Sequence, residues 1–304
     1  METIKYLGLP NCRRLSDGNV ELIVTTDVGP RIMRYGFSGG ENVLGEWPDK
    51  KSVTKLGEFR LLGGHRLWAA PELEELTYGP DNGPVEVRVA SPNRLQLVQP
   101  VDAAGLEKEI DIVLDHGSAI LKHRITNRRK APVELAPWAL TIMRGLGTAI
   151  IPSEPYKGHD ECFLPARQMV SWHYTNLADP RIKFGKKHTL LRSIEGEKEP
   201  TKIGFGNRLG WAAYAVAGSL FVKKFPWIEK GRYPDMGCNC EFYTEGSFLE
   251  VESIGPLATL APGESVEHAE QWWLLRDVEI GQSEESVETA LDAARASLKL
   301  AQRP

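Results

Sequence analysis

Short segments in which hydrophobic and polar residues alternate dominate the chain, and turns rich in Gly, Pro, Asn and Asp separate them. A period of two places successive side chains on opposite faces of a strand. Helical periods do not intervene between these segments, so the pattern predicts an all-β antiparallel sandwich or barrel rather than βαβ units. The predicted strands cover residues 19–29, 31–37, 84–91, 94–100, 107–114, 119–127, 133–143, 218–225, 238–244, 247–253 and 265–275.

One amphipathic helix is predicted near the C-terminal end. In SEESVETALDAARASLKLA (283–301) apolar residues recur at helical spacing, and Ser283 followed by acidic residues is typical of a helix start. We expect this helix to pack on the outside of a sheet. The strand pattern continues on both sides of the polar stretch RSIEGEKEP (192–200), which predicts one domain over residues 1–304.

Composition and charge exclude several classes of function. The chain of 304 residues has a formal net charge of −4 and no basic arm, so nucleic acid is not an expected partner. The first residues lack the pattern of a signal peptide, and the longest apolar run (211–222) is too short to span a membrane. We therefore expect a cytoplasmic protein that does not bind a membrane; the oligomeric state stays open.

We expect the protein to bind neither a cofactor nor a metal ion. Walker A, GxGxxG, GxSxG and HExxH motifs do not occur in a supporting context. Cys238 and Cys240 could bind a metal, but no second Cys/His pair lies at the spacing of a zinc site. A neighbouring pair of reduced, packed thiols is the simpler interpretation.

The segment GGHRLWAAPE (63–72) is the densest unusual stretch. Its glycines allow close approach of the backbone, and His65, Arg66, Trp68 and Glu72 follow within a few residues. One interpretation is a tight turn in which Arg66 pairs with a carboxylate and Trp68 fills the core. The other is a ligand site, in which charged groups bind hydroxyls and an aromatic wall stacks on the CH face of a sugar.

Two further segments combine charge with apolar surroundings. In FVKKF (221–225) Lys223 shares a strand face with Phe221 and Phe225, so it is either a lysine at a sheet edge or a functional group. In YPDMGCNCEFYT (233–244) Glu241 lies on a polar face with Asn239 and Tyr243, opposite the cysteines, and Asp235 lies in the preceding turn. That polar face points either to solvent or to a cleft.

The segment FLEVESIGP (248–256) places Glu250 and Glu252 on one face of a predicted strand, opposite Leu249 and Val251. Such a face usually meets solvent, but it could also line a cleft in which a carboxylate transfers protons.

Taken in order, these segments resemble the galactose mutarotase-like (aldose 1-epimerase) superfamily, and a bacterial branch of it in particular. The resemblance runs to about residue 280 and rests on VGPRIMRYGFSGGENVLGE (28–46), GGHRLWAAPE, ITNRRKAPVELAPWAL (125–140) and FLEVESIGPLATLAPGESVEHAEQWWLL (248–275). It implies an antiparallel β-supersandwich that binds a small-molecule sugar or sugar acid. A glutamate of the late acid-bearing strand acts as general base in the family, and it aligns with Glu250.

The family's proton-donating histidine does not carry over, because the segment after Pro132 contains Trp138 and no histidine. His65 is then the candidate acid. The candidate binding residues are Arg66, Trp68, Glu72, Trp138, Lys223, Asp235, Glu241 and Glu252. Three functions stay open: an aldose epimerase-like isomerase, a sugar-binding protein without catalysis, and a lyase acting on uronates.

Overall fold

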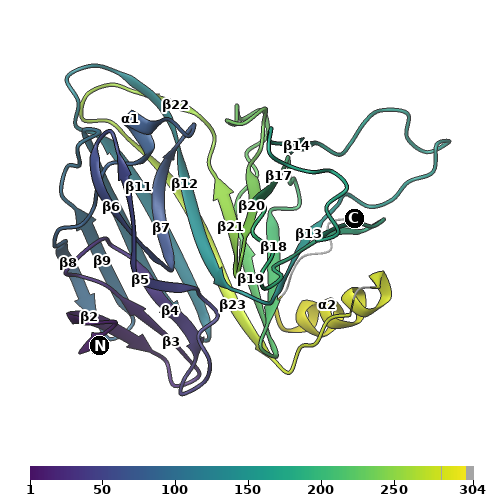
Figure 1. The fold of residues 1–304 in the computed structure, drawn as a ribbon, viewed down its shortest axis with the longest axis horizontal. Coiled ribbons are helices and arrows are strands. Elements are labelled where there is room, and N and C mark those ends of the chain that lie inside the picture. Colours follow the sequence, from purple (N-terminus) through teal and green to yellow (C-terminus); the bar gives the residue numbers. More distant parts are fainter. Residues whose placement is uncertain (282, 299–304) are drawn as a thin grey trace.

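Two large antiparallel sheets packed face to face form the protein in the computed structural model, which describes residues 1–281 and 283–298 (Figure 1). The first is an eleven-stranded sheet in the order β1-β2-β3-β4-β7-β12-β21-β20-β17-β14, with β22 paired to β12. The second is a ten-stranded sheet in the order β15-β16-β13-β18-β19-β23-β11-β10-β9-β8. This architecture confirms the predicted antiparallel sandwich.

Both sheets take strands from both halves of the chain. The eleven-stranded sheet contains β1 (Glu2–Tyr6), β2 (Leu9–Ser16), β3 (Val20–Val24), β4 (Ile32–Phe37), β7 (His65–Ala70), β12 (Val133–Arg144), β14 (Met169–Ser171), β17 (Thr201–Phe205), β20 (Cys240–Glu245), β21 (Phe248–Ile254) and β22 (Ala258–Leu260). The ten-stranded sheet contains β8 (Glu86–Ser91), β9 (Arg94–Gln99), β10 (Leu106–Asp115), β11 (Ser118–Asn127), β13 (Thr148–Pro152), β15 (Ile182–Phe184), β16 (His188–Arg192), β18 (Trp211–Val216), β19 (Ser219–Lys224) and β23 (Ser265–Arg276).

The main core lies between the two sheets, where alternate residues of each strand face the opposite sheet. Leu249 and Val251 of β21, Phe242 of β20 and Phe221 of β19 all belong to this core. Each predicted strand corresponds to an observed one, because the alternation that predicted it also fills the core.

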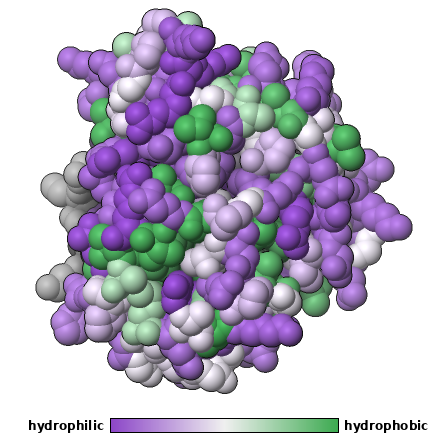
Figure 2. Space-filling model, turned by 90° about the vertical axis from the view of Figure 1, so that its left-hand side faces the viewer, coloured by the Kyte–Doolittle hydropathy of each residue, from purple (hydrophilic) through white to green (hydrophobic). Residues whose placement is uncertain are grey.

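A separate two-stranded hairpin, formed by β5 (Glu46–Thr54) and β6 (Gly57–Gly63), pairs only with itself in the described chain. The short helix α1 (Glu74–Thr77) follows β7. Figure 2 shows the end of the molecule formed by the N-terminal strands, where hydrophilic side chains predominate and hydrophobic ones are interspersed.

The predicted C-terminal helix is confirmed as α2 (Glu284–Leu298), while residues 299–301 of the prediction lie outside the described residues. Val287, Leu291 and Ala294 pack against the outer face of the ten-stranded sheet, on residues that include Ala213 and Val222. Neither helix of the described ranges has the length and apolar character needed to traverse a lipid bilayer.

Candidate functional site

A cleft of about 410 Å³ lies on the face of the eleven-stranded sheet that is turned away from the second sheet. We call it the primary cleft. Strands β7, β12 and β21 contribute to it, and the β5–β6 hairpin supplies one wall. Its aromatic lining residues are Trp47, Phe59, Trp68, Tyr78, Trp138, Tyr174, Tyr243 and Phe248; its charged ones are Lys50, Glu72, Lys202, Glu245 and Glu250.

The register of the strands determines which side chains face this cleft. Glu250 pairs with Ile142 of β12 and Tyr243 of β20, and Glu252 pairs with Leu140 and Glu241. Paired residues of adjacent strands point to the same face, so the carboxylates of Glu250, Glu252 and Glu241 belong to one side of the sheet. The predicted common face of Glu250 and Glu252 is therefore the cleft side.

One lysine lies among these carboxylates. Lys202 Nζ is 2.7 Å from Glu241 Oε2 and 3.2 Å from Glu252 Oε2, and all three side chains are almost fully buried. The ammonium group lies 4.7 Å from the ring centre of Trp138 and 4.8 Å from that of Trp172, which adds cation–π attraction. Trp138 Nε1 donates a hydrogen bond of 2.7 Å to Glu252 Oε2, so Trp138 fixes this carboxylate as well as lining the cleft.

The crowding of acids raises the pKa of several of them. Burial and the neighbouring Glu252 raise the pKa of Glu250 to about 8, although Lys202 and Arg66 oppose this shift. Burial also raises the pKa of Glu241 well above its usual range and raises the pKa of Asp235. Glu250 is partly exposed to the cleft, so a carboxyl group that titrates near neutral pH meets any bound ligand.

Glu72 and Asp235 lie at the edge of the acidic group. Glu72 lines the cleft from its exposed rim and accepts a hydrogen bond from the hydroxyl of Tyr78. Asp235 is partly buried in a turn with a positive φ of 49°, where its charge interacts with Lys202. Of the two predicted binding residues, Glu72 therefore lines the cleft with Glu250, while Asp235 does not line it and interacts with Lys202 and Glu241.

Arg66 points to the same side of the sheet but is buried beneath aromatic rings. Its guanidinium carbon is 4.9 Å from the ring centre of Phe59 and 4.7 Å from that of Trp68, and Nη2 donates to the Leu61 carbonyl at 2.8 Å. Burial lowers its pKa to about 9. Arg66 thus packs against the rings of Phe59 and Trp68, and its positive charge acts on Glu250.

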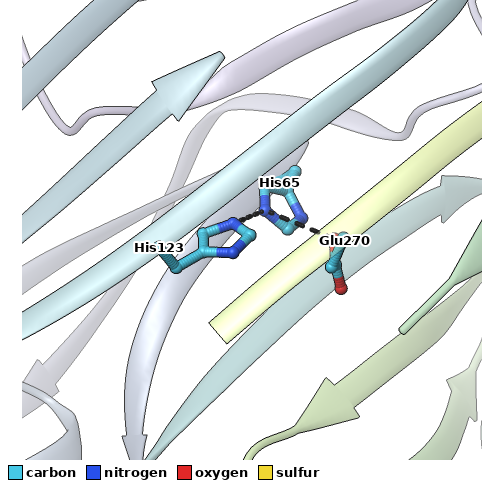
Figure 3. Close-up of side chains that lie close together, drawn as sticks. All are labelled: His65, His123 and Glu270. Atoms are coloured by element: carbon cyan, nitrogen blue, oxygen red, sulfur yellow. Dashed lines mark hydrogen bonds and ion pairs between the residues drawn. The ribbon is translucent and has the colours of Figure 1, made fainter. Parts of the chain in front are cut away.

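The expectation that His65 is the acid partner of Glu250 is wrong. His65 is fully buried between the two sheets, where Nδ1 is 2.8 Å from Thr141 Oγ1 and Nε2 is 2.8 Å from His123 Nε2. Figure 3 shows the rings of His65 and His123 side by side. The physical reason is strand alternation: His65 and Arg66 are consecutive residues of β7, and Arg66 takes the cleft side.

Lys223 also lies between the sheets and does not reach the cleft, so its prediction as a sugar-binding residue is corrected too. Its ammonium group donates to Thr141 Oγ1 at 2.6 Å and to the Val251 carbonyl at 2.9 Å, and it pairs with Glu270 Oε1 at 2.9 Å. The predicted face shared by Lys223 and two phenylalanines is the interior face, and Glu270 provides the compensating charge.

The hydrogen bonds that connect Thr141, His65, His123 and the carbonyl of His268 have defined donors and acceptors. His123 Nδ1 donates to the carbonyl of His268 at 3.2 Å, so the neutral ring accepts at Nε2 from His65. His65 Nδ1 then accepts from Thr141. Burial lowers the pKa of His65 well below its usual value and lowers the pKa of His123 to about 3, so both rings are neutral at pH 7.

The network also contains three groups that could hold a metal ion, because donor atoms of His65, His123 and Glu270 lie within 4.8 Å of one another (Figure 3). The ammonium group of Lys223, however, already pairs with Glu270. A divalent cation would add two positive charges beside that buried lysine, which is electrostatically unfavourable. We assign these residues to the hydrogen-bonded core.

Several cleft residues were not predicted from the sequence. Lys202, Tyr78 and Tyr174 occur in segments without a recognisable motif, and Trp47 and Lys50 belong to the hairpin. The only sequence signal for Lys202 is its place inside the short apolar segment TKIGF (201–205), where a lysine requires a buried partner.

Comparisons with known proteins support the fold. No protein-family model matches the chain, and no curated protein matches its sequence. Among solved structures, a galactose mutarotase-like protein from Lactobacillus casei superposes with a TM-score of 0.54 at 11% identity, covering 87% of this chain and 100% of that one. A galactose mutarotase-like protein from Clostridium acetobutylicum gives 0.53 at 10%, covering 90% and 98%.

A third structure, from Escherichia coli K12, carries the proposed identity of an aldose 1-epimerase and gives a TM-score of 0.55 at 12% identity, covering 88% of this chain and 99% of that one. These TM-scores show a common fold, but identities of 10–12% do not show a common activity. The chemistry has to be argued from the residues of the cleft.

Proposed function

We propose that this chain, which has the fold of the galactose mutarotase-like proteins, binds a neutral sugar in the primary cleft and interconverts its anomers. The observation that carries the proposal is Glu250, a carboxyl group with a pKa of about 8 that lines a cleft walled by aromatic rings. Aromatic faces suit the CH surface of a sugar ring, and a carboxyl that titrates near neutral pH suits proton transfer.

The charges of the cleft favour a neutral sugar over a sugar acid. Glu72, Glu245 and Glu250 line it together with Lys50 and Lys202, and Lys202 is already paired with Glu241 and Glu252. A uronate carboxylate would therefore find Lys202 already paired and would lie close to the carboxylates of Glu72 and Glu245, which oppose its binding. Hydroxyl groups, in contrast, can donate to the same carboxylates.

In the proposed reaction Glu250 removes the proton from the anomeric hydroxyl, and a donor group protonates the ring oxygen as the bond between that oxygen and the anomeric carbon breaks. Ring closure on the other face of the aldehyde, with the proton transfers reversed, gives the other anomer. Among the donors that line the cleft are the ammonium group of Lys202 and the hydroxyl of Tyr174, whereas the hydroxyls of Tyr78 and Tyr243 already donate to Glu72 and Glu245. Burial raises the pKa of Tyr174, so its hydroxyl stays protonated at neutral pH.

A second function, sugar binding without catalysis, has one observation in its favour. None of the residues that line the primary cleft in the described structure is a histidine, and His65 points away from it. Catalysis therefore depends on whether Lys202 or Tyr174 can replace the histidine that the family uses.

The test is exchange NMR on a panel of aldoses that includes glucose, galactose, mannose and xylose, with the wild type, Glu250→Gln and the control Glu75→Gln. Glu75 is exposed on α1 and does not line the cleft. Faster anomer exchange that Glu250→Gln reduces by about 10²–10⁴-fold, and that the control retains, supports the isomerase. Binding without faster exchange supports the second function. Absence of both across the panel overturns the proposal.

A further inference from the structure

A second cleft of about 560 Å³ adjoins the primary cleft. We call it the distal cleft. Trp47 and Phe248 line both clefts, so this pair of rings forms the partition between them. Each cleft falls within the range of volumes that hold small-molecule ligands, and together they make a site that is longer than one sugar ring requires.

The partition offers aromatic surface to both clefts. The rings of Trp47 and Phe248 meet edge to face with centres 4.5 Å apart, and Lys50 Nζ lies 4.9 Å from the centre of the Trp47 ring. Trp47 immediately precedes the register irregularity of the β5–β6 hairpin, which lies between Trp47 and Lys51. Irregularities of this kind redirect side chains beside binding sites. A chain of linked sugars that crosses this partition would meet an aromatic face on each side.

The distal cleft also carries groups for hydroxyl recognition. Glu46 Oε1 accepts a hydrogen bond of 2.7 Å from Asn42 Nδ2 and another from the hydroxyl of Tyr6. Its second oxygen, Oε2, accepts no hydrogen bond from the described part of the chain, so it can accept one from a ligand hydroxyl. Arg144 lines the same cleft with 48% of its side chain exposed and pairs with Glu41, so the cleft contains donors as well as acceptors.

The charge of the distal cleft indicates a neutral occupant. Arg34 and Arg144 supply two positive charges, and Glu41 and Glu46 supply two negative ones. Arg34 Nε also donates to Glu21 at 2.8 Å, so its charge is compensated. A phosphate or uronate would need unpaired arginines, whereas the hydroxyls of a neutral sugar can use both donors and acceptors.

We infer that the distal cleft is a second sugar subsite, so that the ligand is a neutral oligosaccharide whose terminal ring occupies the primary cleft. The inference rests on the proposed sugar-binding function and extends it to the class of ligand. The affinity of the protein for the ligand should therefore increase when a second sugar ring is added, and this increase should depend on residues of the distal cleft.

The experiment is calorimetric titration with glucose, galactose and linear gluco- and galacto-oligosaccharides of two to four units in α-1,4 and β-1,4 linkage. In at least one series the tetrasaccharide should bind about 10-fold or more tightly than the monosaccharide. Glu46→Gln and Arg144→Ala should each reduce that ratio about three-fold or more. Arg144→Ala provides the test if Glu46→Gln does not fold, and Arg124→Ala on the opposite sheet is the control.

Equal affinity for the monosaccharide and the tetrasaccharide in every series overturns the distal subsite and leaves the proposed function intact. A ratio that neither variant changes also overturns it. If neither the monosaccharides nor the oligosaccharides bind, the proposed function itself fails, and the two failures are therefore distinguishable.

Discussion

Glu250 and His65 lie on opposite faces of one sheet, although only strand β12 separates their strands. On β12, Ile142 pairs with Glu250 and the preceding residue, Thr141, pairs with His65. Adjacent residues of a strand point in opposite directions, so the glutamate faces the cleft and the histidine faces the core. The proton transfers that we propose for the cleft therefore have to use groups other than His65.

The pH dependence of anomer exchange should follow the ionisation of Glu250. Its pKa of about 8 means that the carboxylate, the form that acts as a base, increases as the pH rises through 8. We expect kcat/KM for the sugar to rise about 10-fold per pH unit below this value and to level off above it. The profile is measured by exchange NMR between pH 5 and 10, and a flat profile would contradict the role of Glu250 as base.

Glu250 should also affect stability in a pH-dependent manner. Its folded-state pKa of about 8 exceeds the unfolded value of 4.5, so its contribution is fully present below pH 4.5 and is lost as the pH rises through 8. In Glu250→Gln the side chain cannot ionise, so the free energy of unfolding no longer decreases through this group as the pH rises. We expect the variant to be more stable than the wild type by about 1–2 kcal/mol at pH 9, less than the full shift implies because the group is partly exposed.

Urea unfolding of the wild type and Glu250→Gln at pH 4 and pH 9 checks this expectation. The stability difference should be smaller at pH 4 than at pH 9. An equal difference at the two pH values would show that the side chain acts through packing and not through its charge.

His65→Asn should separate the core from the cleft. The substitution removes the partner of His123 Nε2 and leaves a small cavity beside Trp272, whose ring centre lies 4.8 Å from that of His65. We expect a loss of about 2–4 kcal/mol in the free energy of unfolding. The folded variant should keep kcat/KM within about two-fold of the wild type, and a loss of 100-fold with unchanged folding would restore His65 as a catalytic candidate.

Lys202→Met should destabilise the protein most strongly at alkaline pH. Burial acts to lower the pKa of Lys202, but Glu252 and Glu241 outweigh it and raise the pKa well above its usual value. Without this ammonium group the buried carboxyls can remain uncharged at low pH but must ionise or unfold as the pH rises. We expect a loss of about 3–5 kcal/mol at pH 8 and a smaller loss at pH 5.

Chemical unfolding at the two pH values measures this difference. Lys51→Met is the matched control, because Lys51 forms an ion pair with Glu58 in which both side chains are about half exposed. Losses that are equal at pH 5 and pH 8 would show that Lys202 contributes through packing alone.

Much of the fold follows from alternation along the sequence. Residues 248–254 predicted the common face of Glu250 and Glu252, and residues 221–225 predicted a lysine beside two phenylalanines; both patterns are observed. The site is harder to predict, because neither the tight-turn nor the ligand-site interpretation of GGHRLWAAPE includes the strand that His65–Ala70 forms. Consecutive residues of a strand point to opposite faces, so His65 and Arg66 cannot contact the same ligand.

Other parts of the site depend on pairing that a single segment does not reveal. Lys202 reaches Glu241 because β17 pairs with β20, and Trp47 reaches Phe248 because the β5–β6 hairpin extends over the sheet. Such contacts arise between segments far apart in the chain, so alternation gives the face of a residue but not its neighbours.

The β5–β6 hairpin forms hydrogen-bonded strand pairs only with itself in the described chain, yet it supplies Trp47 to the boundary of both clefts. Its exposed positions can therefore vary without disturbing the ladder of the large sheets, whereas Phe59 and Leu62 are buried. Exchange of residues 46–63 between relatives of this fold would alter the length and shape of the two clefts, while Glu250, the residue that we propose as the base, stays in place on β21. In this architecture, ligand recognition and the proposed chemistry can diverge independently.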